Sequence, residues 1–277
     1  APRTEVGRIM FGVLYGLGIV VLYGLLGDAG LPTFYDKLLP VPILALLAWK
    51  ARAPGPLDRR LALLCLFAGA FFAMDLASWH IGIEQTRLAN ATLFGNSGSV
   101  ILMIWGLVAA RRAPSGQEGA GVLAAIAGAA ILLGRSAQIS ADTLMGDLFC
   151  ITAGLFYAVY LLSLQDARRA LGSWGLLARV CMIGAPVLLV LALVKGEPVW
   201  PHDWTPLIVL ALLSQVIGQG LLVFALRAFP PMIIGLALLM QPAVAVVCGY
   251  FAFGEVLGPL DLLGMAMVGA ALAVARA

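Results

Sequence analysis

Apolar segments long enough to cross a lipid bilayer recur along the whole chain, separated by short connections that contain Gly, Pro and charged residues. A transmembrane helix needs roughly 20 predominantly apolar residues, and ten segments meet or approach that length. They lie near residues 8–27, 33–51, 60–82, 88–110, 119–134, 145–164, 174–194, 205–229, 231–253 and 259–275. The connections leave no room for a separate soluble domain, so the pattern predicts an all-α membrane protein with ten transmembrane helices.

Composition and charge agree with this prediction. Hydrophobic residues make up 62% of the 277 residues and charged residues 11%, whereas a soluble domain usually carries about 25% charged residues. By the positive-inside rule, the side of the membrane with more Lys and Arg in its connections is the cytoplasm. If both termini are cytoplasmic, that side holds Arg3, Arg8, Lys50, Arg52, Arg59, Arg60, Arg111, Arg112, Arg168, Arg169, Arg227 and Arg276, and the other side holds only Arg87, Arg135 and Lys195. The sequence therefore predicts cytoplasmic termini.

Several classes of partner are not indicated by the sequence. No basic patch with interleaved aromatic residues suggests binding to nucleic acid. The cysteines lie far apart, each within an apolar segment, at Cys65, Cys150, Cys181 and Cys248. Such thiols are typically buried and inert, so we expect no disulfide, no metal site and no cofactor. The oligomeric state stays open, and a monomer is compatible with the sequence.

An internal repeat relates the two halves of the chain. Residues about 142 to 145 positions apart correspond in the same order: Tyr15 with Tyr157, Lys37 with Arg179, Trp79 with Phe224, and Asn96 with Gln241. Each half contains five predicted spans, an odd number, so the second half must cross the membrane in the opposite direction. Inverted repeats of this kind are typical of secondary transporters, whose substrate site lies where the halves meet. The sequence predicts two five-helix units, residues 1–140 and 141–277, around a central cavity.

The segment LFGNSGSV, residues 93–100, places polar Asn96 and Ser97 inside an apolar span. The repeat aligns it with LLMQPAVA, residues 238–245, which contains Gln241 and Pro242. Glycine and proline weaken or bend helices, and freed backbone groups at membrane depth are tolerated only against protein or a wet cavity. We interpret the two segments as facing walls of one central site, with helix-packing hydrogen bonds as the alternative.

Three ionisable residues fall within the outer parts of the second and third spans. An ionisable group in hydrocarbon costs at least about 2.5–3.5 kcal/mol and usually has a partner. Lys37 paired with Asp36 or Asp75 would reduce the cost of both ions. The alternative is that these charges take part in proton coupling or contact a charged part of the substrate.

Aromatic and amide side chains supply further candidates. Trp79 and His80 end the third span. Trp79 has a belt or packing role or forms an outer wall of the cavity. His80 binds a proton, contacts a substrate carboxylate or makes an interhelical hydrogen bond. Other candidates for an apolar pocket with polar tips are Tyr15, Tyr157, Tyr160 and Gln219. Gln219 shares a helix face with Gln215, so interhelical hydrogen bonding is its alternative role.

Two long segments resemble a known family. Residues 146–169, GDLFCITAGLFYAVYLLSLQDARR, resemble the start of the EamA repeat of the drug/metabolite transporter superfamily, and residues 224–274 resemble its end, including Gln241-Pro242 and Gly254-Glu255. In the first half, Asn96-Ser97 replaces the polar-Pro step. The resemblance implies ten helices, cytoplasmic termini, the bacterial inner membrane and a central cavity open to one side at a time.

Within that superfamily, residues 77–99 resemble bacterial exporters of aromatic and other hydrophobic amino acids. We therefore expect a secondary transporter that exports small hydrophobic metabolites, aromatic and other apolar amino acids above all. The alternatives are a cationic-drug or other metabolite carrier of the same superfamily and a passive channel. The motifs H-E-x-x-H, G-x-S-x-G and G-x-x-x-x-G-K-[ST] are all missing from the sequence, so we do not expect an enzyme.

Overall fold

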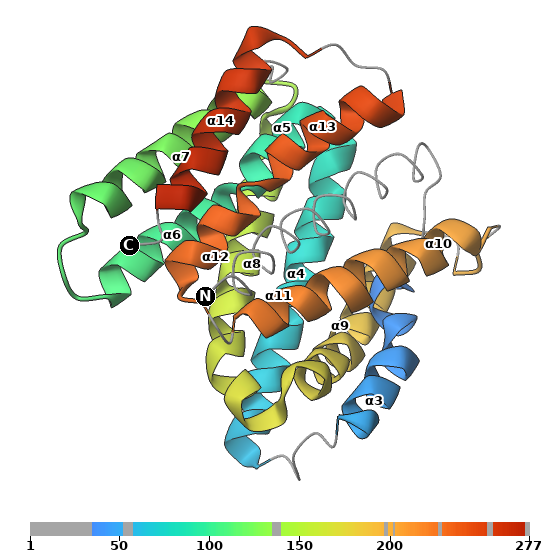
Figure 1. Cartoon of the computed structure of the whole chain (residues 1–277). Helices are drawn as coiled ribbons and strands as arrows, with labels where there is room; N and C mark the ends of the chain where they lie inside the picture. Colours follow the sequence, from blue (N-terminus) through green and yellow to red (C-terminus); the bar gives the residue numbers. More distant parts are fainter. Residues whose placement is uncertain are drawn as a thin grey trace.

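The computed structural model describes residues 35–51, 58–134, 140–196, 199–201, 203–226, 229–253 and 257–274. Helices make up most of these residues, and no strand occurs among them (Figure 1). The predicted all-helical class is therefore confirmed for the described part. The predicted first span, 8–27, and Tyr15 lie outside the described residues, and of Asp36 only the backbone is described.

The helices of the first half correspond to four predicted spans. They are α2 (Tyr35–Leu38), α3 (Pro40–Lys50), α4 (Arg59–Gln85), α5 (Leu88–Gly95), α6 (Ser97–Ala109) and α7 (Gly116–Gly134). The predicted span 33–51 is interrupted at Leu39, because proline at the first position of α3 has no N–H to continue the preceding turn. Asp58 begins α4 by accepting a hydrogen bond from the Leu61 N–H at 2.7 Å.

The second half begins with two long helices, α8 (Leu144–Leu171) and α9 (Ser173–Lys195), joined by Gly172 alone. Gly172 has φ 68° and ψ 165°, a conformation that residues with a side chain rarely adopt. The remaining elements are α10 (Thr205–Leu210), the π-helix η1 (Ala211–Gly218), α11 (Gln219–Ala225), α12 (Pro231–Leu238), α13 (Gln241–Phe253) and α14 (Pro259–Val274).

Six helical stretches among the described residues are long and apolar enough to cross a membrane. They are Arg59–Gln85, Asn90–Ala109, Gly116–Gly134, Leu144–Gln165, Ser173–Lys195 and Leu207–Ala225, and three shorter apolar helices accompany them. Large apolar side chains cover the outside as well: Leu123 is 71% exposed and Val194 and Phe251 are 79% exposed. Such a surface is a liability in water and suits a lipid environment. The chain is a multi-pass membrane protein.

Two helices are broken in the same way in the two halves. α5 and α12 have eight residues each, and α6 and α13, which follow them, have thirteen each. The residue after α5, Asn96, and the residue after α12, Leu239, share φ −68° and ψ −6°. The paired helices start 143 and 144 residues apart. Aligned on the starts of α6 and α13, Gln241 corresponds to Ser97, the residue next to Asn96, with which the sequence pairs it.

Pro242 explains the break between α12 and α13. It lies at the second position of α13, lacks an N–H, and is tolerated only in the first turn of a helix. At the α5–α6 break no proline is present, and the Asn96 side chain instead donates to the Thr92 carbonyl at 2.7 Å. The same bend is thus produced by different side-chain chemistry in the two halves.

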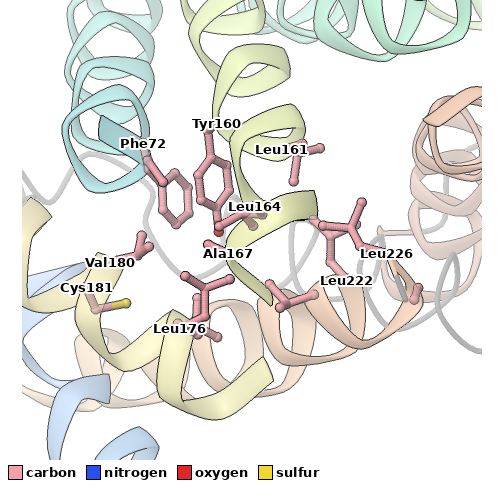
Figure 2. Packing of buried hydrophobic residues seen from close by; sticks show 14 of the residues in the cluster. Phe72, Tyr160, Leu161, Leu164, Ala167, Leu176, Val180, Cys181, Leu222 and Leu226 are labelled. Atoms are coloured by element: carbon pink, nitrogen blue, oxygen red, sulfur yellow. The ribbon is translucent and has the colours of Figure 1, made fainter. Parts of the chain in front are cut away.

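Helix pairs pack through small residues. α4 packs most extensively on α8, α7 pairs with α14, α6 with α12, and α3 with α9 (Figure 1). At the crossing of α7 and α14, a methyl group added to Gly128 would lie 2.8 Å from the Gly264 carbonyl oxygen. In lipid, such close backbone approach replaces the hydrophobic driving force between helices. The main buried cluster lies between α4, α8, α9 and α11 (Figure 2).

The contact between α8 and the α5–α6 break gives a stability prediction. A methyl group at Gly154 of α8 would lie 2.8 Å from the Gly98 nitrogen and 2.9 Å from the Gly95 carbonyl oxygen. We expect Gly154→Ala to destabilise the protein by about 1–3 kcal/mol, because backbone atoms cannot move aside cheaply. Thermal unfolding of the purified protein in detergent measures the change.

Gly269→Ala in α14 is the matched control. A methyl group at Gly269 would meet no atom within 4 Å, and alanine favours a helix over glycine by roughly 0.5–1 kcal/mol. We expect an unchanged or slightly raised Tm. Equal Tm values for the two variants would contradict the tight crossing at Gly154.

Candidate functional site

A lysine side chain is buried within the helical bundle. Lys37 of α2 has no exposed surface. Its Nζ donates to Oε1 of Gln215 at 2.6 Å and lies 3.1 Å from the centroid of the Phe72 ring. The amide oxygen and the ring face both stabilise the ammonium, since aromatic faces attract cations strongly where water is excluded. An ionisable residue in such a position marks a functional site by default.

Small residues make room for the stem of this lysine. A methyl group added to Gly184 of α9 would lie 3.5 Å from Cγ of Lys37, 3.5 Å from the Gly69 carbonyl oxygen and 3.8 Å from Cβ of Ala73. Gly69 and Ala73 belong to α4, which packs on α9 at this point. The stem of Lys37 therefore lies in a slot between two helices that larger side chains would close.

Aromatic rings continue the site on the other side of Phe72. The ring of Tyr160 stacks on that of Phe72 with centroids 4.1 Å apart and planes 9° apart, as Figure 2 shows. Tyr157, one helical turn earlier on α8, lies 5.9 Å from Tyr160 and 6.4 Å from Phe72 between ring centroids. The Tyr160 hydroxyl donates to Oε1 of Gln219 at 3.5 Å. Each aromatic pair contributes roughly 0.5–1.5 kcal/mol beyond burial.

The two glutamines are presented by a π-helical segment. Gln215 lies within η1 and Gln219 follows its last residue, and both side chains are buried. In a π-helix the hydrogen bonds run from residue i to i+5, so residues four apart lie on nearly the same face. Such segments are rare and are frequent at functional sites. Here the segment directs both amides toward Lys37 and Tyr160.

We call Lys37, Phe72, Tyr160, Gln215 and Gln219 the lysine–aromatic cluster. Lys37 and Phe72 belong to the first half of the chain, on α2 and α4. The other three belong to the second half, on α8, η1 and α11. The cluster thus joins the two halves of the sequence at one buried place.

Asp75 lies beside the lysine–aromatic cluster. It follows Phe72 by three residues on α4, so the two share a helix face. Its carboxylate interacts electrostatically with Lys37, and the residue is only partly buried. The sequence predicted that Lys37 pairs with Asp36 or Asp75; in the structure the ammonium contacts Gln215 and the Phe72 ring and interacts electrostatically with Asp75.

Other predicted site residues gather elsewhere, at the α5–α6 break. The ring of Trp79 packs directly on Gly95, so Trp79 contacts protein at this break. Ser97 Oγ donates to the Ile151 carbonyl at 3.4 Å, and the Asn96 amide donates to Thr92 within its own helix. The Ser97 contact is a helix-packing hydrogen bond, the alternative that the sequence left open, whereas the Asn96 bond stays within its own helix.

The structure places the last two predicted residues as follows. Gln241 is partly buried and begins α13. His80, partly buried on α4, lies within electrostatic range of Glu84 and Lys195, which form an ion pair of 2.7 Å. Neither residue makes a hydrogen bond or ring contact that would join it to the lysine–aromatic cluster among the interactions described.

Sequence reasoning missed Phe72 as a site residue. In the sequence of an apolar span, a phenylalanine that lines a site has the same hydrophobic character as one that faces lipid. The available signal was position: Phe72 precedes the charged Asp75 by three residues and therefore shares its face. Gln215 was recognised only as a hydrogen-bonding neighbour of Gln219, and its partner Lys37 is 178 residues away.

A second buried carboxylate, Asp147, ties the halves together at the start of α8. It accepts hydrogen bonds from the Thr86 hydroxyl at 2.5 Å, the Asn90 amide at 3.1 Å and the Thr143 hydroxyl at 3.2 Å. Thr86 and Asn90 connect α4 with α5. A negative charge in the first turn of a helix is also favoured by the helix dipole. This cluster is a structural junction.

The sequence of this chain is similar to those of known membrane transporters. The EamA-like transporter family matches residues 144–276. The chain carries an EamA-like transporter domain. This family belongs to the drug/metabolite transporter superfamily, and YddG, the aromatic amino acid exporter that residues 77–99 resemble, is a related member.

Characterised and uncharacterised transporters are among the relatives. The threonine/homoserine exporter RhtA of Escherichia coli K12 is 32% identical over 152 residues, which cover 54% of this chain and 51% of RhtA. The chain therefore spans about half the length of that relative. An uncharacterised transporter of Archaeoglobus fulgidus is 26% identical over 273 residues, 98% of this chain and 95% of the relative.

A solved crystal structure matches the fold over almost the whole chain. The TM-score is 0.79 at 16% sequence identity, and the match covers 99% of this chain and 97% of the other. At this level of identity the likeness shows the fold alone.

Phe72 gives a stability prediction for the lysine–aromatic cluster. We expect Phe72→Leu to lower the free energy of unfolding by about 2 kcal/mol or more, because the Lys37 ammonium loses the ring face and Tyr160 loses its stacking partner. Thermal unfolding in detergent measures the loss.

Phe224→Leu on α11 is the control, since Phe224 is 62% exposed. Substitution at an exposed position should change stability by no more than about 0.5 kcal/mol. A Tm for Phe72→Leu as high as that of the control would show that the ring does not stabilise the buried lysine.

Proposed function

We propose that the protein is a secondary transporter that exports small hydrophobic metabolites, with aromatic and other apolar amino acids as its cargo, by alternating access. The EamA-like domain and the likeness to an amino-acid exporter support transport of this class. The observation that carries the proposal is the lysine–aromatic cluster, in which residues of both halves meet in an otherwise apolar interior.

The chemistry around the cluster fits an apolar zwitterion. Such a substrate needs a counter-charge for its amino group, hydrogen-bond donors for its carboxylate and an apolar surface for its side chain. Asp75 supplies the counter-charge for the amino group, and the amide groups of Gln215 and Gln219 can donate hydrogen bonds to the carboxylate. Tyr157 is partly buried beside Phe72 and Tyr160, and these rings supply the apolar surface for the side chain of the substrate.

The proposed architecture is two inverted five-helix repeats, residues 1–140 and 141–277, around a central site. The matching lengths and backbone angles of the broken helices α5–α6 and α12–α13 support the duplication. The contacts of α7 with α14 and of α3 with α9 also relate equivalent helices of the two halves. In such folds one bundle rocks against the other around the site.

The proposed location is the bacterial inner membrane, with both termini in the cytoplasm. The excess of Lys and Arg in the connections on that side supports it. Because every residue of the cluster comes from a single chain, a monomer would contain the whole site. The substrate and the lipid bilayer are the partners of this proposal, and no nucleic acid, cofactor or metal enters it.

Counterflow in liposomes tests the proposed function. We expect the purified protein to exchange external labelled phenylalanine or tryptophan for unlabelled substrate trapped inside, without ion current. Threonine and homoserine belong on the same panel because RhtA exports them. Ion current without saturable exchange would identify a channel, and exchange of organic cations alone would identify a cationic-drug carrier.

Asp75→Asn links the transport assay to the site. Loss of the counter-charge should reduce amino-acid exchange by about tenfold or more, since a charged pair in a dry site is worth well over 1.4 kcal/mol. Asp58→Asn is the control on the same helix, because asparagine caps a helix as well as aspartate does. Equal exchange by the two variants would exclude Asp75 from substrate binding.

A further inference from the structure

The environment of the Lys37 ammonium is itself a recognition site for a primary amine. The ammonium contacts an amide oxygen of Gln215 at 2.6 Å and an aromatic face of Phe72 at 3.1 Å. A carboxylate, that of Asp75, lies within electrostatic range. Amide oxygen, ring face and carboxylate are the groups that proteins use to bind a free alkylammonium ion.

Lys37 fills this site completely. Lys37 and Tyr160 have no exposed surface, and Phe72 is 2% exposed. Asp75 and Tyr157, by contrast, remain partly accessible next to them. A second ammonium ion can reach the Gln215 oxygen and the Phe72 face only if the lysine head moves away.

The position of Lys37 in the chain permits that movement. α2 is a single turn of four residues, and Pro40 separates it from α3. A helix this short gains little from cooperative hydrogen bonding, and the stem lies in a slot lined by Gly69, Ala73 and Gly184. This short turn is therefore the part of the site that can move with the lysine.

The site occurs once in the part of the chain that the structure describes. Arg179 is the residue that the sequence repeat pairs with Lys37. Its guanidinium donates to the Gly175 carbonyl of its own helix at 2.8 Å. The repeat therefore does not duplicate the ammonium site, and the buried lysine is a specific feature of the first half.

We propose that the ammonium of Lys37 is a tethered competitor that occupies the binding site for the amino group of the substrate. This inference rests on the proposed function, because it names the group that the same site recognises. When the substrate amine enters, the lysine leaves, and when the substrate departs, the lysine returns. The charge beside Asp75 stays the same in both states, so the cycle never leaves a buried carboxylate without a counter-ion, which would be strongly unfavourable.

Equilibrium binding to the purified, detergent-solubilised full chain tests the inference. The probes are phenethylamine, which has an amine and no carboxylate, and 3-phenylpropionate, which has a carboxylate and no amine. In Lys37→Met we expect phenethylamine to bind about tenfold more tightly than in the unmodified protein, because a competitor is removed. The affinity for 3-phenylpropionate should change by less than about twofold.

Lys50→Met is the matched control. Lys50 is exposed in the last turn of α3, so both affinities should equal those of the unmodified protein. If Lys37→Met does not yield folded protein, Lys37→Gln removes the charge and keeps a group that can hydrogen bond to Gln215. The same tightening of phenethylamine binding is expected there.

Two results would overturn the inference. Loss of 3-phenylpropionate binding with unchanged phenethylamine affinity would make Lys37 the partner of the substrate carboxylate. Unchanged affinity for both probes would leave Lys37 with a packing role only. Binding is measured independently of transport. If the protein exchanges amino acids and shows either of these results, only the inference about Lys37 is refuted. If the protein exchanges no amino acid in the counterflow assay, the proposed function is refuted.

Discussion

Lipid offers no hydrogen bonds, and this constraint explains where the polar groups of this protein lie. Each one placed at membrane depth must find its partner in protein, at a cost of several kcal/mol if it does not. Asn96 meets the constraint within its own helix, through the Thr92 carbonyl. Lys37 meets it across the molecule, through Gln215 and the ring of Phe72. The Asn96 hydrogen bond acts within one helix, whereas the Lys37 hydrogen bond to Gln215 links the two halves of the chain.

Small residues decide which helices can come close enough to satisfy that constraint. Gly154 brings α8 against the backbone of the α5–α6 break, and Gly128 brings α7 against α14. Gly184, with Gly69 of α4, opens the slot in which the stem of Lys37 lies. The glycines thus have two effects. They allow the close van der Waals contact that holds helices together in lipid, and they leave space for the buried side chain of Lys37.

Much of the helical arrangement could be predicted from apolar segment length alone, because a membrane helix must satisfy its backbone internally. Lys37 and Asp75 were also predicted as site residues, since an ionisable group in such a span is costly without a partner. Tyr157 and Tyr160 were predicted because a tyrosine gives an apolar pocket a polar tip. The π-helix could not be predicted, because its extra residue per turn leaves no mark on hydropathy. Nor could the pairing of Lys37 with Gln215, which depends on tertiary packing between helices far apart in sequence.

The links between the halves have a property that suits a moving protein. Across the lysine–aromatic cluster they are one short hydrogen bond, from Lys37 to Gln215 at 2.6 Å, and the stacked rings of Phe72 and Tyr160. Beside the stem of Lys37, α4 and α9 meet at Gly69, Ala73 and Gly184, which present smooth surfaces. A smooth contact can slide with little loss of packing, whereas interlocked large side chains would have to separate first. In the proposed alternating-access cycle, the polar contacts of the cluster would contribute to the free-energy difference between the two arrangements of the halves. A substrate that replaces those contacts with its own can shift the balance between them.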